Sequence, residues 1–336
     1  MHSVPRPPRS RKRGEAGASR APWKKRARFS VLAAIAFLAG CASPSQLATP
    51  GIAVKNGVAA RSTDLLYVSD LGSNSVDYFT YPALKAVGKL TGFGSVAGVC
   101  SNKGGDVFVV DEAGPVVVYA HGGTQPIRKL QIRGAPYGCA VDPVTGDLAV
   151  TNLSAVLYGT VTIYAHAKGK GKIYEDYKVG TTDFCAYDGK GNLFIDGSNL
   201  SAQFVLLELP KGGHGFHTYS LTRSVKNAGG VQWDGKYVAI SDRGAGVIYR
   251  TTTTGKVAQV IRLKGGPQVD GFWLAGATLI GPNAQSGGAV AFWHYPAGGA
   301  PIKTMREFLE PYAATISASA GTLRPESADS ADSSRN

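Results

Sequence analysis

The chain repeats one pattern of hydrophobic and polar positions six times, at spacings of 41–45 residues. Each copy contains a short run of β-branched and aromatic residues that ends in Asp, Asn or Gly. The six runs are DLLYVSD (64–70), GDVFVVD (105–111), GDLAVTN (146–152), GNLFIDG (191–197), KYVAISD (236–242) and ATLIGPN (277–283). Runs of this length and composition predict β-strands, and no helical periodicity of useful length interrupts them.

Each copy predicts three further strands around this run. A second apolar strand precedes five of the six runs, as in YGCAVD (137–142), and a third strand follows, as in VTIYAH (161–166). A more polar fourth strand comes next, as in KVAQVIRL (256–263). Four antiparallel strands in each of six copies predict an all-β fold, a six-bladed β-propeller of four-stranded blades.

The two ends of the repeat array complement each other. The first copy lacks the inner strand that should precede it, and the C-terminal segment PYAATISAS (311–319) supplies a spare one. We expect residues 313–318 to pair with 65–69 and to close the ring. The predicted propeller is therefore 64–319, and the small polar residues of 320–336 predict a disordered tail.

The basic charge of the chain is concentrated at its N-terminus. Residues 1–29 carry +9 of the formal net charge of +13. The apolar run that follows, 31–39, has nine residues, whereas a spanning helix needs about 20. This pattern is typical of a secretory signal peptide, here 1–40. Since the basic excess belongs to the signal, we expect no nucleic-acid partner.

The end of the predicted signal, Leu38-Ala39-Gly40-Cys41, resembles the lipobox of bacterial lipoproteins. The resemblance implies cleavage before Cys41, lipidation of its thiol and a tether over 41–63. The expected partner is then a membrane, contacted through an N-terminal lipid anchor. The expected location is the bacterial cell envelope, on its periplasmic or outer surface. An ordinary signal peptide with an incidental cysteine is the alternative.

One blade carries a family resemblance. PYGCAVDPVTGDLAVTN (136–152), followed by the VTIYAH strand, resembles NHL repeats and the gluconolactonase/regucalcin-type six-bladed propellers. The resemblance covers about 64–318 and supports the same fold. It implies little about activity, because propellers host many unrelated functions.

Polar residues gather at the face where these runs end and the inner strands begin. They are Asp70, Asp111, Asn152, Asp242 and Asn283 at strand ends, and Tyr137, Asp183 and Asp270 at strand starts. Carboxylates and amides that converge on a channel mouth could bind Ca²⁺, which takes six to eight oxygen ligands. In the competing interpretation, each strand-end side chain accepts hydrogen bonds from the amides of a neighbouring turn.

The gluconolactonase resemblance singles out Asp270. The segment Val269-Asp270-Gly271-Phe272 resembles the inner strand that supplies an Asp metal ligand in those enzymes, with Asn152 and Asp183 as companions. They also use an inner-strand Glu, which 313–318 lacks. G-x-S-x-G, H-E-x-x-H, P-loop and C-x-x-C motifs are missing from the sequence. We therefore expect a non-enzymatic binding or scaffold module for a small-molecule, glycan or protein ligand. The alternative is a Ca²⁺-dependent lactonase or related hydrolase.

The histidines are weak metal candidates. His121 and His166 occupy the repeat position that reads Tyr81 and Tyr295 in other copies, which indicates an aromatic position beside a turn. The pair in KGGHGFHTY, at 214 and 217, has no Cys or carboxylate neighbours in the sequence. Zinc needs three or four ligands, so this segment predicts a solvated turn.

Three cysteines remain after Cys41. Cys139 and Cys185 occupy one position of the inner strand in adjacent blades, whereas Cys100 is one position out of phase and points to the other face of its strand. A Cys139–Cys185 disulfide is the pairing we consider, provided that the two Cα atoms lie within about 7 Å. Three buried thiols are the alternative.

Lysines recur in the turns at the end of the predicted disc opposite the polar face. A basic face of this kind could meet phospholipid head groups or an anionic polymer of the envelope. The alternative is a set of solvated hairpins.

Overall fold

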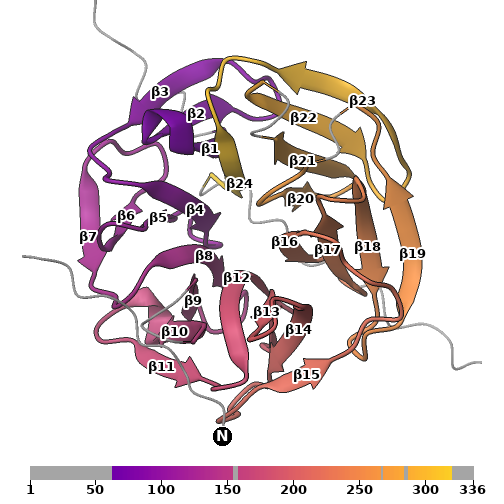
Figure 1. Ribbon diagram of the computed structural model, residues 1–336. Coiled ribbons are helices and arrows are strands. Elements are labelled where there is room, and N and C mark those ends of the chain that lie inside the picture. Colours follow the sequence, from indigo (N-terminus) through magenta and orange to yellow (C-terminus); the bar gives the residue numbers. More distant parts are fainter. Residues whose placement is uncertain (1–62, 154–157, 266–267, 284–286, 320–336) are drawn as a thin grey trace, which may run out of the picture. The chain divides into compact units, whose positions relative to one another are not determined.

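The computed structural model describes residues 63–153, 158–265, 268–283 and 287–319. Six four-stranded antiparallel sheets are arranged in a ring around a central channel (Figure 1), which confirms the predicted fold. The predicted signal peptide and tail lie outside the described residues, as does all of the predicted tether except residue 63. Within the described part, the helices are the 3-10 turns η1 (Leu71–Ser73) and η2 (Ala165–Ala167), and none is long and apolar enough to cross a membrane.

The strands of each blade are given from the channel outward. Blades 1 to 3 are β24 (Pro311–Ser317), β1 (Leu65–Asp70), β2 (Ser75–Thr80), β3 (Ala86–Leu90); β4 (Val96–Ser101), β5 (Val107–Asp111), β6 (Val116–Tyr119), β7 (Pro126–Leu130); and β8 (Pro136–Val141), β9 (Leu148–Asn152), β10 (Thr160–Tyr164), β11 (Lys172–Glu175). Blades 4 to 6 are β12 (Val179–Tyr187), β13 (Leu193–Asn199), β14 (Phe204–Leu209), β15 (His217–Tyr219); β16 (Ala228–Trp233), β17 (Val238–Asp242), β18 (Val247–Thr251), β19 (Val257–Arg262); and β20 (Trp273–Ala275), β21 (Thr278–Asn283), β22 (Ala289–His294), β23 (Gly298–Met305).

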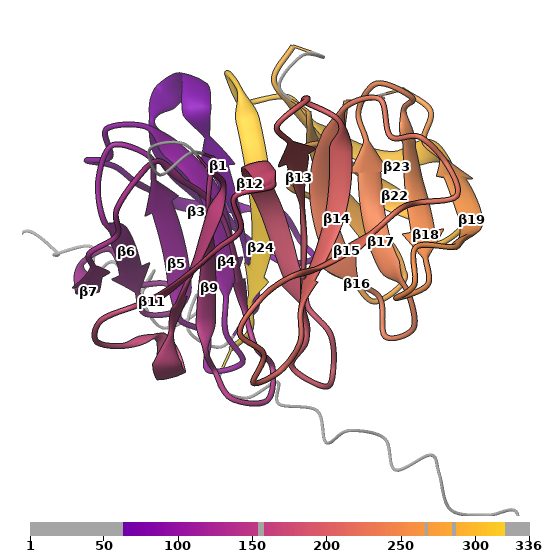
Figure 2. The ribbon, with the colours of Figure 1, turned by 60° about the horizontal axis from the view of Figure 1, so that its bottom comes forward.

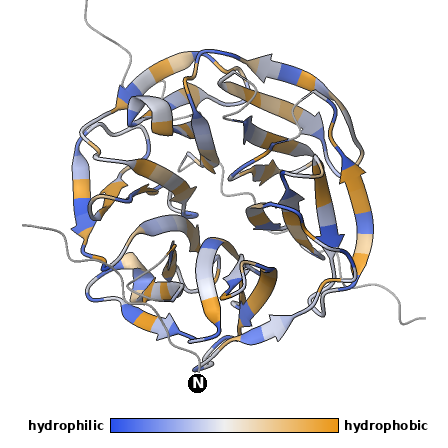
Figure 3. Ribbon diagram, in the orientation of Figure 1, coloured by the Kyte–Doolittle hydropathy of each residue, from blue (hydrophilic) through white to orange (hydrophobic). Residues whose placement is uncertain are grey.

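Burial falls from the middle of each blade to its rim. Every residue of β1, β5, β9 and β17 is buried, because these strands have a neighbouring blade on each face. The outermost strands mix hydrophilic and hydrophobic positions, as the rim in Figure 3 shows, and they are more exposed than the strands in the middle of the blade. Charged side chains on such an outer strand discourage edge-to-edge pairing with other chains.

The hydrophobic core is divided among the gaps between neighbouring blades. Leu66 and Val68 pack against blade 6, whereas Leu65 and Tyr67 of the same strand pack against blade 2. This alternation follows from the two-residue period of a strand. The other blade contacts are made by analogous clusters, so each blade is held by both of its neighbours.

The C-terminal strand closes the ring as predicted. β24 pairs antiparallel with β1, with Leu65 opposite Ser317 and Ser69 opposite Ala313. Its side chains also reach blade 2, because Ser317 Oγ donates to the Gly105 carbonyl (2.6 Å) and contacts His121 Nδ1 (2.7 Å). Blade 1 is therefore assembled from the two ends of the described chain.

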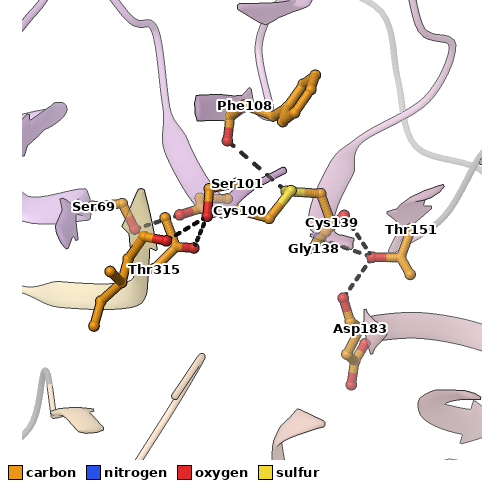
Figure 4. Close-up of a disulfide and its surroundings, with 11 residues drawn as sticks. Ser69, Cys100, Ser101, Phe108, Gly138, Cys139, Thr151, Asp183 and Thr315 are labelled. Carbon is orange, nitrogen blue, oxygen red and sulfur yellow. Dashed lines mark hydrogen bonds between the residues drawn. A yellow bond between two sulfur atoms is a disulfide. The ribbon is translucent and has the colours of Figure 1, made fainter. Parts of the chain in front are cut away.

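The disulfide joins Cys100 to Cys139, with Cα atoms 5.8 Å apart (Figure 4), so the Cys139–Cys185 pairing is wrong. Cys139 and Cys185 share a phase, so both point toward the blade that precedes their own and cannot meet. Cys100 has the opposite phase and points forward, into the same interface as Cys139. Cys185 is buried against blade 3 as a free thiol, and burial raises its pKa.

Removal of the closing strand should unfold the propeller. Deletion of residues 311–336 exposes both β1 and the inner wall of blade 2. We therefore expect the cooperative thermal transition, measured by circular dichroism, to be lost. Deletion of 322–336 leaves β24 intact and should leave the melting temperature within a few degrees of wild type. Equal melting temperatures for the two truncations would contradict closure by β24.

The disulfide should stabilise the chain measurably. It encloses a loop with a sequence separation of 39, for which chain entropy predicts about 3–4 kcal/mol. We expect Cys139→Ser to lower the free energy of urea unfolding by this amount and Cys185→Ser to change it much less. A non-reduced peptide map that links Cys185 to either other cysteine would overturn the assignment.

Candidate functional site

The strands run between the two ends of the ring (Figure 2). The mouth end is the end where the inner strands begin and the next strands finish. Equivalent starting positions of the inner strands are Ala97, Tyr137, Asp183, Gly229, Asp270 and Tyr312, as the strand registers show. The predicted candidates Tyr137, Asp183 and Asp270 thus lie in one ring around the channel mouth.

Three aromatic rings pack against each other at this end of the channel. Tyr137 and Tyr312 are in an edge-to-face contact with centroids 5.4 Å apart, and Phe184 contacts both rings at 5.5–5.8 Å. The Tyr312 hydroxyl donates to that of Tyr137. Burial raises the pKa of Tyr137, and the negative charge of Asp183 acts in the same direction. The Tyr137 hydroxyl therefore stays protonated and can donate or accept hydrogen bonds.

Asp270 is paired with an arginine. Arg243 Nη1 donates to Asp270 Oδ1 at 2.5 Å, and Nη2 donates to Asn227 Oδ1 at 3.1 Å. The Asp270 side chain is 4% exposed and that of Arg243 is 25% exposed. Arg243 Nε is buried without a hydrogen-bond partner among the described residues. Two hydrogen bonds therefore hold the guanidinium in place while part of the side chain stays exposed.

Two more carboxyl groups lie nearby. Asp196, in β13, is fully buried and its Oδ1 accepts from the Phe184 amide at 2.7 Å. Burial raises its pKa well above the ordinary range, and the charge of Asp183 adds to the effect. Burial also raises the pKa of Asp183, against a hydrogen bond from Thr181 and the charge of Arg243. We infer that Asp196 is protonated and that Asp183 carries the negative charge of the pair.

Three predicted strand-end carboxylates accept hydrogen bonds from backbone amides of the neighbouring loops. Asp70 accepts from the amides of residues 72, 309 and 310, Asp111 from those of 94, 95 and 113, and Asp242 from those of 226, 227 and 245. These are the bonds that the competing interpretation expects. Each carboxylate fixes the loop that leads into the inner strand of its blade.

The two strand-end asparagines are buried. Asn152 is 0% exposed, and its backbone amide donates to Thr182 Oγ1. Its side-chain amide has no hydrogen-bond partner among the described residues. Asn283 is 1% exposed at the end of β21. Neither side chain lies open at the mouth.

Four of the candidate carboxylates already have protein partners. Three of the carboxylates are occupied by amides of three separate loops, and Asp270 is neutralised by Arg243. A calcium ion takes six to eight oxygens that converge on one point. Within the residues that the structure describes, no group of three or more His, Cys, Asp and Glu side chains is arranged to hold a metal. Arg243 places a positive charge directly beside Asp270.

The histidines have structural partners. His121 Nε2 contacts the Thr63 carbonyl at 3.1 Å, in addition to its contact with β24. His166 Nδ1 lies 2.8 Å from the Thr145 carbonyl, within blade 3. His217 is an exposed residue of the outer strand β15. The contacts of His121 and His166 agree with their interpretation as positions beside a turn, whereas His217 lies in a strand and not in the solvated turn that we expected.

An open cleft extends from the mouth over blades 4 and 5. Its volume is about 880 Å³, within the range of small-molecule sites. Arg243, Tyr137 and Asp183 line its inner wall. Apolar side chains such as Phe204, Leu221 and Val225 line part of the remaining surface. The polar residues there are Thr181, Ser198, Asn199, Gln203, Thr218, Tyr219, Ser220, Ser224, Asn227, Arg223 and Lys226. A separate cavity of about 240 Å³ lies between the inner strands.

Arg243 and Asp196 are not among the candidates predicted from the sequence. The position after each strand end reads Leu71, Glu112, Leu153, Ser198, Arg243 and Ala284, so Arg243 is the basic residue of its column. Asp196 is a carboxyl inside the hydrophobic run LFID, and a charged residue in a buried strand is itself a signal. Both residues stand out when the positions directly before and after each strand-end residue are compared across the six repeats.

No protein-family model and no curated protein sequence matches this chain. Solved structures do resemble it. A chain of a nidogen/laminin complex superposes with a TM-score of 0.64 at 13% identity, over 76% of this chain and 99% of that one. A protein of unknown function from Bacteroides caccae gives a TM-score of 0.58 at 13% identity, over 76% and 99%. Kuenenia stuttgartiensis hydrazine synthase gives 0.52 at 13% identity, over 68% and 72%. At these identities the likeness is one of fold.

Asp196 should make the stability of the protein depend on pH. Its raised pKa means that the folded state keeps a proton that the unfolded chain releases near pH 4. The free energy of unfolding should therefore fall as the pH rises from about 4. Asp196→Asn keeps the acceptor for the Phe184 amide and should flatten this dependence in urea titrations between pH 4 and 8.

Asp106→Asn, in a half-buried turn between β4 and β5, is the control for loss of one carboxyl. It should keep the slope of wild type. If Asp196→Asn also kept that slope, Asp196 would be ionised in the folded protein.

Proposed function

We propose that this chain is an exported, lipid-anchored binding module that holds an acidic, hydroxyl-rich ligand in the cleft at its mouth end. The observation that carries the proposal is the guanidinium of Arg243, which Asp270 and Asn227 hold in place at the inner wall of the cleft. An arginine fixed by its neighbours loses little entropy when it binds a carboxylate or phosphate.

The rest of the cleft supports a ligand with many hydroxyl groups. Hydroxyl and amide side chains are common in its outer lining, and over the whole cleft the cations Arg223, Lys226 and Arg243 outnumber the carboxylate Asp183. Tyr137 adds an aromatic surface and a protonated hydroxyl. Saccharides that carry uronate or phosphate groups combine these features.

Two features support export and anchoring. The Leu38–Cys41 segment resembles a lipobox, and the Cys100–Cys139 disulfide fits a chain that folds in an oxidising compartment. A hydrolase dependent on Ca²⁺ is the weaker candidate, because Arg243 neutralises the carboxylate on which that hypothesis rests.

Calorimetric titration with soluble oligosaccharides tests the proposed ligand. We expect uronate-containing oligosaccharides to bind and neutral ones of equal length to bind at least tenfold more weakly. Arg243→Met should weaken uronate binding at least tenfold. Arg133→Met removes an exposed arginine from the loop between β7 and β8, outside the cleft, and should leave it unchanged.

Three results would overturn this proposal. One is that no acidic oligosaccharide binds. A second is that acidic and neutral oligosaccharides bind equally. The third is that Arg133→Met weakens binding as much as Arg243→Met does. Thermal melts of both variants should accompany the titrations, because Arg243→Met leaves the buried Asp270 carboxylate without its ion pair.

A further inference from the structure

The end of the ring opposite the mouth carries exposed lysines. We call it the lysine end and define it by the turns that join the first strand to the second and the third to the fourth in each blade. Its lysines are Lys85, Lys103, Lys168, Lys170, Lys190, Lys211, Lys236 and Lys256, and all are exposed. The ion pairs of the described residues involve none of them.

The carboxylates at this end are held close to the backbone. Asp142 and Asp188 are each 4% exposed and accept hydrogen bonds from the amides of their own turns. Asp234 pairs with Arg250 at 2.6 Å. The half-buried Asp106 accepts from the Asn102 side chain. At this end the lysine ammonium groups are therefore exposed, whereas these carboxylates are bound to protein partners.

Both ends of the described propeller leave from the lysine end. Thr63 precedes β1, and its carbonyl contacts His121 in the turn between β6 and β7. Ser319 follows β24, and its amide donates to Asp64 at 2.9 Å. A chain anchored through Cys41 is thus joined to its lipid at the lysine end, through residues 42–62.

The connection alone does not orient the propeller. Residues 42–62 can reach about 70 Å when fully extended, at roughly 3.3–3.6 Å per residue. Such a length permits either end to face the bilayer. The charge of the lysine end supplies the preference, because basic side chains are attracted to anionic head groups within about a Debye length.

We propose that the lysine end is a docking surface for anionic phospholipid head groups, which holds the mouth and its cleft away from the membrane. The orientation rests on the proposed lipid anchor, since the anchor keeps the propeller close enough for weak charge contacts to act. The cleft then opens toward the solvent, where a soluble ligand can reach it.

The full chain, purified from membranes and reconstituted into vesicles, tests this surface. A fluorophore is placed at Gly189→Cys, in a lysine-end turn with open space around it, or at the exposed Thr91→Cys at the mouth end. In vesicles with 30% phosphatidylglycerol, head-group nitroxides should quench the label at position 189 at least threefold more than that at 91. In pure phosphatidylcholine, or in high salt, the difference should vanish.

Two matched variants assign the effect to the lysines. Replacement of Lys103, Lys168 and Lys190 by Gln should abolish the difference. Replacement of three mouth-end cations, Lys178, Lys226 and Arg306, by Gln should leave it intact. Equal quenching of the two labels in phosphatidylglycerol vesicles, or equal effects of the two variants, would overturn the docking surface.

Flotation separates this inference from the anchor. A lipidated chain floats with phosphatidylcholine vesicles whatever its lysines, so failure to float would contradict the lipid anchor alone. Among the chains that float, the quenching difference between the labels at positions 91 and 189 then tests the surface. Its loss in the lysine-end variant, with retention in the mouth-end variant, supports the surface; the reverse would overturn it.

Discussion

The phase of each strand relative to its two neighbouring blades is the constraint on which this structure depends. Along every inner and second strand, alternate side chains point into the interface with the preceding blade and the interface with the following blade. A shift of the strand by one residue would therefore place each side chain in the wrong interface. Closure by β24 locks this phase around the ring, because β24 pairs with β1 and also reaches blade 2. The same phase decides that Cys139 meets Cys100 and not Cys185.

The mouth is a consequence of the same phase. Equivalent starting positions of the inner strands face one opening, so Tyr137, Asp183, Asp270 and Tyr312 surround the channel although they are far apart in the sequence. Strand-end carboxylates such as Asp111 hold the entry loops in place. The loop after β17 then adds Arg243, which pairs with Asp270 and gives the mouth both positive and negative charge. Neighbouring positions of the repeat therefore have different roles: strand-end residues such as Asp242 hold the loops, and the next residue, Arg243, contributes to the site.

The sequence predicted the features that follow from the two-residue period of a strand. It did not predict contacts that depend on the side-chain directions of two strands in different blades. The strands, the blade count and the closing strand follow from hydrophobic alternation within short segments. The Cys139–Cys185 pairing considered each strand alone, whereas a contact between blades requires opposite phases. Arg243 lies in a loop, where no alternation fixes the direction of a side chain. Asp70 and Asp242 were correct in position, but only the structure shows that amides already occupy them.

The central claim is that an arginine places a positive charge directly beside Asp270 at the mouth of this propeller, which favours a binding module over a calcium-dependent hydrolase. Calorimetric titration of the purified protein with Ca²⁺ tests this claim most directly. We expect no binding heat up to millimolar Ca²⁺, since Arg243 already neutralises Asp270. A saturable heat with a dissociation constant below one millimolar, lost in Asp270→Asn, would contradict it.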